Sequence, residues 1–167
     1  MNKTFWCLKG YLGQALKTGV AAMAALGLAG LFQLPESYWA AISAIVVMQS
    51  DVGAVFSAGW TRLAGTAIGA IVAVAFVTAW GHNVFAFGAA VTAAILICLL
   101  MKLVDSYRLA GVTVAIVMLV GGRPGPPWVI AFHRFAEVSI GIVVALLVSS
   151  LVRPSHARKG SAPRENG

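Results

Sequence analysis

Six apolar stretches, separated by short polar segments, dominate the chain. They cover residues 18–34, 38–50, 63–80, 84–101, 109–120 and 135–152, and the last has an apolar lead-in from Trp128. A helix needs about 20 apolar residues, within a range of about 17 to 25, to cross the hydrocarbon core of a bilayer. Most of the stretches reach or approach that length. The pattern therefore predicts an all-α polytopic membrane protein with six transmembrane helices.

The second and fifth stretches, residues 38–50 and 109–120, are too short to cross a bilayer unaided. Either they extend through their less apolar flanks, or they are broken helices that neighbouring helices shield from lipid. Both are the middle stretch of a set of three. Interrupted spans at matching places in two halves of a chain are typical of the substrate site of a secondary transporter.

The two halves also share a sequence register. Arg62-Leu63-Ala64 leads to Ile68-Gly69-Ala70, and Arg134-Phe135-Ala136 leads to Ile140-Gly141-Ile142, with the same spacing between Arg and Gly. Three spans form an odd number, so the second unit has the opposite direction in the membrane. The pattern predicts two inverted three-helix repeats, which are common in secondary transporters.

Charge distribution predicts the orientation. Only 10% of the 167 residues are charged, against about 25% in an ordinary soluble domain. With six spans, the predicted inner segments hold most of the cations: Lys3, Lys9, Lys17, Arg62, Lys102, Arg108, Arg153, Arg158, Lys159 and Arg164. The outer segments hold Arg123 and Arg134. This bias predicts a multi-pass protein of the cell inner membrane with both termini in the cytoplasm.

Three segments follow from this topology: a cytoplasmic segment at residues 1–17, a six-helix transporter domain at 18–153, and a disordered basic cytoplasmic tail at 154–167. The first lysines ahead of an alanine-rich run also fit a signal peptide, but no clean small-x-small cleavage site follows. The net charge of +7 is explained by orientation, since no basic stripe interleaved with aromatic residues indicates nucleic acid binding.

Several segments resemble those of a known family. They are the run from Leu34 to Gln49, with Pro35-Glu36-Ser37-Tyr38-Trp39, then Arg62-Leu63-Ala64-Gly65-Thr66-Ala67-Ile68-Gly69, then His133-Arg134-Phe135-Ala136-Glu137 and Arg153-Pro154. The chain resembles the fusaric acid resistance family of aromatic acid exporters over about residues 12–154. The resemblance implies a bacterial inner-membrane transporter domain. Many members carry two such domains and a large cytosolic region. Two copies of the single domain seen in this sequence would match those two domains, so the resemblance also implies a homodimer.

Glu137 is the first candidate for function, because an ionisable group inside a span is costly and suggests a role in transport. Arg134 lies on the same helix face, so a local ion pair, a proton-coupling or substrate site, and a dimer contact all remain open. Arg62 and Arg134 are expected to begin long spans. They are either snorkelling anchors that orient the helices or anion-attracting mouths at the two ends of a path.

Four further residues belong to the candidate substrate path. Gln49 and Asp51 close the second stretch, where they line a polar vestibule or merely cap a helix. Tyr107 and Arg108 open the fifth stretch, where they engage an aromatic acid or anchor the helix at the interface. The glycines Gly65, Gly69 and Gly141 are expected to let helix backbones pack closely, with a backbone substrate site as the alternative for the GxxxG pair.

No motif of an enzyme, a metal site or a cofactor site is present. The leading hypothesis is a transporter or exporter domain for small organic acids, with aromatic acids as one candidate class, that is coupled to protons. An anion channel of the same fold and a non-transporting membrane scaffold are the alternatives. The expected partners are the lipid bilayer, a second copy of the chain and a small organic anion.

Overall fold

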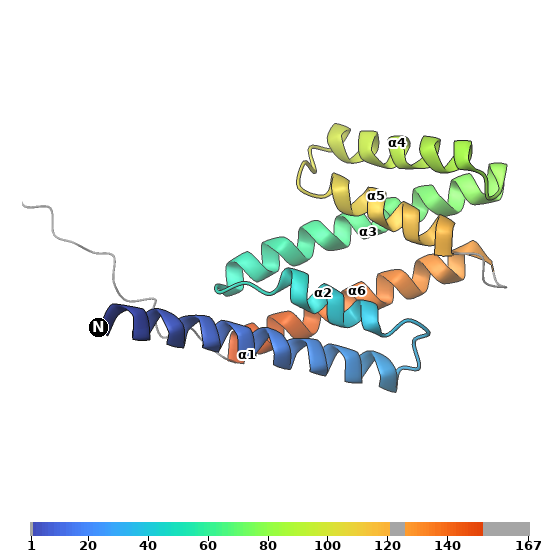
Figure 1. The fold of residues 1–167 in the computed structure, drawn as a ribbon. Coiled ribbons are helices and arrows are strands. Elements are labelled where there is room, and N and C mark those ends of the chain that lie inside the picture. Colours follow the sequence, from blue (N-terminus) through green and yellow to red (C-terminus); the bar gives the residue numbers. More distant parts are fainter. Residues whose placement is uncertain (1, 121–125, 152–167) are drawn as a thin grey trace, which may run out of the picture.

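The computed structural model describes residues 2–120 and 126–151, and the side chains of residues 11–119 and 126–151. All regular elements of this part are helical: α1 (Asn2–Leu31), α2 (Tyr38–Val47), α3 (Val52–Trp80), α4 (Val84–Leu100), α5 (Tyr107–Ala115), the π-helix η1 (Ile116–Val120) and α6 (Pro127–Leu151). Successive helices run back and forth, and the end of α6 lies on the same side as the start of α1 (Figure 1). The predicted tail at 154–167 lies outside the described residues.

Three of the described helices are long and apolar enough to cross a bilayer. They are the segment Tyr11–Leu31 of α1, all of α3 and all of α6. The helices α2, α4 and α5 with η1 are apolar but shorter. The all-α membrane architecture therefore follows from the structure, whereas six full crossings remain a prediction.

The helix α3 begins earlier than expected. The apolar pattern predicted a span from Leu63, but the carboxylate of Asp51 accepts a hydrogen bond from the backbone N–H of Ala54 at 3.2 Å and caps a helix that begins at Val52. The expectation that Arg62 begins its span is therefore wrong. Arg62 lies about three turns inside α3.

The helix α6 also begins earlier than its clean apolar stretch. Pro127 occupies the first helical position, where its missing N–H costs nothing and its fixed φ suits the helix. Arg134 is consequently in the second turn of α6 and does not begin the helix.

The two middle helices are short in the structure as well. The ten residues of α2 rise about 15 Å, roughly half the hydrocarbon core. At Met48 the backbone becomes extended, with ψ 121°. The helix α5 has nine residues and continues as the π-helix η1. The ending of α2 favours a broken helix, whereas α5 continues through η1 up to the limit of the described residues.

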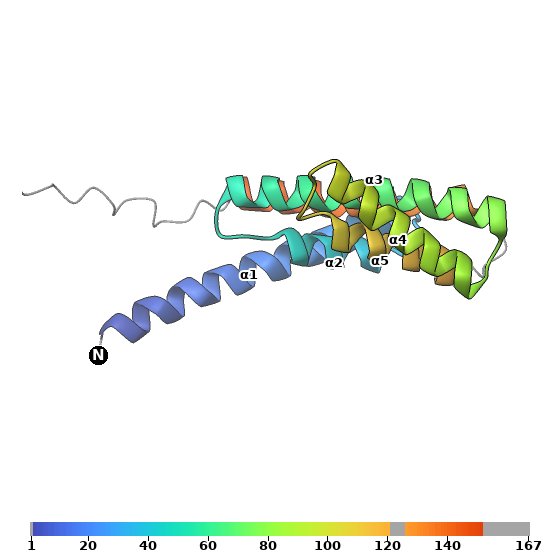
Figure 2. The same ribbon diagram turned by 90° about the horizontal axis from the view of Figure 1, so that it is seen from above.

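The packing of the first three helices matches that of the last three. The helix α2 packs against α1 and α6, while α5 packs against α4 and α3. The helices α3 and α6 pack against each other in one layer, with α2 and α5 in the layer beside it (Figure 2). Exchanging α1–α3 for α4–α6 therefore reproduces the same set of helix contacts.

Burial follows the same correspondence, residue by residue. The fully buried Ala21, Ala25 and Ala29 of α1 correspond to Ala90, Ala94 and Cys98 of α4, at one constant separation along the chain. Both helices end in the same way. Gln33 and Lys102 have positive φ, 52° and 59°, and each following residue donates a backbone hydrogen bond to Ala29 or Cys98. The two halves thus share core positions and helix ends.

Candidate functional site

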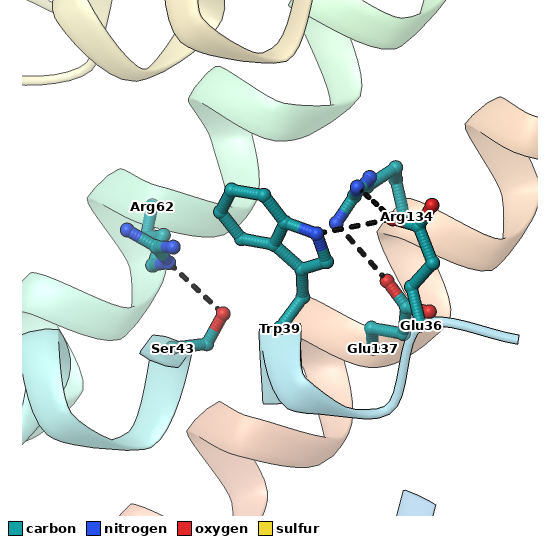
Figure 3. Close-up of polar contacts among 6 residues, drawn as sticks. All are labelled: Glu36, Trp39, Ser43, Arg62, Arg134 and Glu137. Atoms are coloured by element: carbon teal, nitrogen blue, oxygen red, sulfur yellow. Dashed lines mark hydrogen bonds and ion pairs between the residues drawn. The ribbon is translucent and has the colours of Figure 1, made fainter. Parts of the chain in front are cut away.

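A buried ionic cluster joins α6 to the start of α2. Nη1 of Arg134 donates to Oε2 of Glu137 at 3.3 Å, and Nη2 of Arg134 forms an ion pair with Oε2 of Glu36. Arg134 is 4% exposed and Glu137 is 1% exposed. Figure 3 shows the guanidinium between the two carboxylates. The local ion pair, one of the three alternatives that the sequence left open for Glu137, is therefore present.

The indole of Trp39 completes the surroundings of Arg134. Its Nε1 donates to Oε2 of Glu36 at 3.0 Å, and Cζ of Arg134 lies 4.2 Å from the centre of the indole ring. A cation over an indole face is attracted by the ring's quadrupole. Glu36 precedes α2 and Trp39 lies in its first turn, so the start of α2 holds the guanidinium against α6.

The cluster contains two carboxylates and one guanidinium. Within the described part of the chain, Oε1 of Glu137 is buried and has no hydrogen-bond partner. A buried polar atom without a partner is uncommon and calls for an explanation. With all three groups ionised the cluster carries one negative charge, and a single proton makes it neutral.

The second arginine of the repeat has different surroundings. Nε of Arg62, on α3, donates to Oγ of Ser43, on α2, at 3.2 Å. Arg62 is partly buried, Ser43 is fully buried, and no carboxylate within the described residues forms an ion pair with Arg62. The two repeat-related arginines thus differ: Arg134 is shared by two carboxylates, and Arg62 has a neutral partner.

Neither arginine is a surface anchor at the end of a helix. Arg134 is almost fully buried and its charged group contacts α2, so the snorkelling interpretation of Arg134 is wrong. The apolar stretches alone did not reveal the position of either arginine within its helix, because each helix begins well before the arginine. Both guanidinium groups lie among the helices (Figure 3).

The other predicted path residues do not join the cluster. Gln49 and Asp51 are exposed at the far end of α2, and Asp51 caps α3. Arg108 is exposed, and its Nε donates to the hydroxyl of Tyr107 at 3.0 Å. Asp51 thus caps the start of α3, and transport roles for Gln49, Asp51, Tyr107 and Arg108 stay predictions.

The predicted packing glycines lie where helix backbones meet. A Cβ on Gly65 would lie 2.7 Å from the carbonyl oxygen of Ser106. A Cβ on Gly69 would collide with the carbonyl oxygen of Ala110, and one on Gly141 with that of Ala40. These contacts join α3 to α5 and α6 to α2 inside one chain, as expected for small residues at helix crossings.

Two members of the cluster, Glu36 and Trp39, were not predicted. Glu36 is one of only five acidic residues in the chain and stands at the edge of the short apolar stretch. An acid next to a predicted span was a detectable indication of a site. The contact of Trp39 with Arg134 depends on the packing of α2 against α6. No group of His, Cys, Asp or Glu among the described residues could hold a metal ion.

One protein family matches most of the chain. The fusaric acid resistance protein family matches residues 11–164. A protein of Escherichia coli K12 described as the uncharacterized transporter YdhK is 31% identical over 161 residues, which cover 86% of this chain and 24% of the relative. A UPF0421 protein of Bacillus cereus is 28% identical over 145 residues, which cover 86% of this chain and 40% of the relative.

A UPF0421 protein of Staphylococcus epidermidis is 30% identical over 145 residues, which cover 84% of this chain and 42% of the relative. The chain thus spans less than half the length of these curated relatives. No solved structure gives a significant match.

Proposed function

Since the chain belongs to the fusaric acid resistance protein family, we propose that it is a membrane transporter domain that moves small organic acids and couples their movement to protons. Aromatic acids are one candidate class of substrate. The observation that carries this proposal is the buried cluster in which Arg134 is shared by Glu36 and Glu137. One relative is itself described as a transporter.

The cluster suits proton coupling because its charge is unbalanced. Breaking or unbalancing a buried ion pair costs about 3 to 5 kcal/mol when a charge is left uncompensated. A proton taken up by Glu137 balances the charges of the cluster, and its release restores one negative charge. Oε1 of Glu137, which is buried without a partner among the described residues, is the atom that we propose for this proton.

The two short helices supply the proposed path. We propose that the domain crosses the inner membrane six times, as two inverted three-helix repeats with both termini in the cytoplasm. The matched contacts of the two halves support this arrangement. Broken helices near the bilayer centre are where secondary transporters bind their substrates. Glu36 and Trp39 stand at the start of one of them, α2, beside Arg134 and Glu137.

Liposomes test this function. Purified protein is reconstituted, and the uptake of radiolabelled benzoate is measured with and without a pH gradient across the membrane. A coupled transporter accumulates benzoate against its concentration gradient only while the pH gradient lasts. Empty liposomes give the background, since protonated benzoic acid also crosses lipid.

Two other results would contradict the proposal. Benzoate flux that follows the membrane potential and ignores the pH gradient would indicate an anion channel. Flux equal to that of empty liposomes, for benzoate and for a panel of aliphatic acids, would indicate a non-transporting membrane scaffold.

A further inference from the structure

Arg62 is a guanidinium among packed helices without a counter-ion in the described part of the chain. Its Nε donates a hydrogen bond to Oγ of Ser43 at 3.2 Å. No hydrogen bond or ion pair involves its two terminal nitrogens within the described residues. Cations inside membrane spans are costly and pair with acids or with backbone carbonyls. An unpaired guanidinium at this place therefore calls for an anion that the protein itself does not supply.

We propose that Arg62 and Ser43 form the binding site for the single carboxylate of a monoanionic substrate. This inference rests on the proposed function and adds the residues that would hold the anion. The bond from Nε to Ser43 fixes the plane of the guanidinium and leaves both terminal nitrogens for the ligand. Two parallel N–H donors match the two oxygens of a carboxylate, and this bidentate geometry is specific to arginine.

The neighbourhood of Arg62 sets the class of ligand. Ser43 lies one helical turn after Trp39 on α2, so the two side chains share a face of that helix. Figure 3 shows the indole between the guanidinium groups of Arg62 and Arg134. A carboxylate on Arg62 therefore has an aromatic surface beside it, and an acid with an apolar body fits better than an inorganic anion.

Charge balance limits the ligand to one negative charge. Arg134 is already shared by two carboxylates, so it does not attract a further anion. Arg62 has no carboxylate partner among the described residues, and one monocarboxylate neutralises it. A dicarboxylate would place a second negative charge near the acidic cluster. The structure thus assigns the anion to Arg62 and the proton to the cluster around Glu137.

Direct binding tests this assignment separately from transport. The protein in nanodiscs is titrated with radiolabelled benzoate, with benzamide as an uncharged competitor of similar shape and succinate as a dianion. We expect saturable benzoate binding that benzamide does not displace and that succinate displaces poorly. Arg62→Gln should weaken benzoate binding about tenfold or more, the effect of losing about 1.4 kcal/mol.

Two milder variants keep the test valid if Arg62→Gln does not fold. Arg62→Lys retains the charge but loses the fork, so we expect weakened binding that is still detectable. Ser43→Ala releases Nε and should weaken binding by a smaller factor. The matched control is Lys102→Gln, which also removes one positive charge. Its equivalent in the first half is Gln33, which adopts the same positive φ, so the fold should tolerate glutamine there.

Several results would overturn the assignment. They are the absence of saturable benzoate binding to the wild-type protein, unchanged binding by Arg62→Gln or Arg62→Lys, and an equal loss in Lys102→Gln. Glu137→Gln should retain benzoate binding while losing coupling to the pH gradient. Transport measurements with Glu137→Gln therefore test the proton role, whereas binding measurements with the Arg62 variants test the anion site, so the two proposals can fail independently.

Discussion

At the scale of single residues, the departure of Glu137 from the repeat is the most informative. The equivalent position in the first half is Gly65, which packs tightly against α5. In the second half a carboxylate occupies this position, and it is accommodated because Arg134 pairs with it. The buried cluster thus combines Glu36 and Trp39 of the first half with Arg134 and Glu137 of the second half.

Arg134→Met should strongly destabilise the protein. It would leave the buried carboxylates of Glu36 and Glu137 together without their guanidinium, at an expected cost of about 3 kcal/mol or more. Thermal unfolding of the detergent-solubilised protein measures this. The double variant Arg134→Met with Glu137→Gln should recover part of the loss, because it removes one of the two charges. A single variant as stable as the wild type would contradict the ionic account of this cluster.

Spacing along one helix was enough to predict the pair of Arg134 and Glu137, because residues three apart share a helix face. Glu36 lies 98 positions from Arg134 in the sequence, and only the packing of α2 against α6 brings them together. The different partners of Arg62 and Arg134 could not be predicted from the sequence pattern either, since the same kind of apolar motif follows both arginines.

At the scale of elements, glycines of the two long helices allow the short helices α2 and α5 to pack closely against them. The sequence predicted that both middle stretches are too short to cross a bilayer, because the length of an apolar stretch can be counted directly from the sequence. The early start of α3 was missed, because the cap at Asp51 extends the helix into a less apolar segment. The start of α6 at Pro127 lies one residue before the apolar lead-in that the sequence showed from Trp128.

Gly69→Ala and Gly141→Ala should each destabilise the fold by about 1 to 3 kcal/mol, because overpacking forces helix backbones apart. The added methyl groups would collide with the carbonyl oxygens of Ala110 and Ala40. Gly88→Ala is the matched control, since open space surrounds that position in α4. It should be neutral or stabilising by up to about 1 kcal/mol, because alanine is the better helix former.

Unfolding in detergent, followed by circular dichroism, compares the three glycine variants. If the two buried positions tolerated alanine as well as Gly88 does, the close helix contacts described for α3 with α5 and α6 with α2 would be wrong.

At the scale of the whole molecule, the described residues include one buried acidic cluster, around Arg134, and a second arginine within a long helix, Arg62, that forms no ion pair there. Six crossings, inverted repeats and cytoplasmic termini remain predictions. The pairwise contacts of the helices agree with them. Residues 154–167 lie outside the described part of the chain, and only their positive charges were used to predict the orientation.

We expect the chain to form a homodimer in mild detergent. The resemblance to a family in which many members carry two such domains is the reason for this prediction. Size-exclusion chromatography with light scattering measures the protein mass without the detergent. A monomer that still transports in liposomes would contradict it.

Proton movement that accompanies acid transport tests the central claim most directly. Liposomes containing a pH-sensitive dye are supplied with benzoate, and the proton flux caused by the protein is compared for the wild type, Glu137→Gln and the control Asp105→Asn. Asp105 is the exposed counterpart of Glu36 in the second half. Glu137→Gln should insert and fold, since a neutral amide leaves Arg134 paired with Glu36 alone. The account predicts substrate-dependent proton flux in the wild type and in Asp105→Asn, and its loss in Glu137→Gln. Wild-type proton flux in a well-inserted Glu137→Gln variant would contradict it.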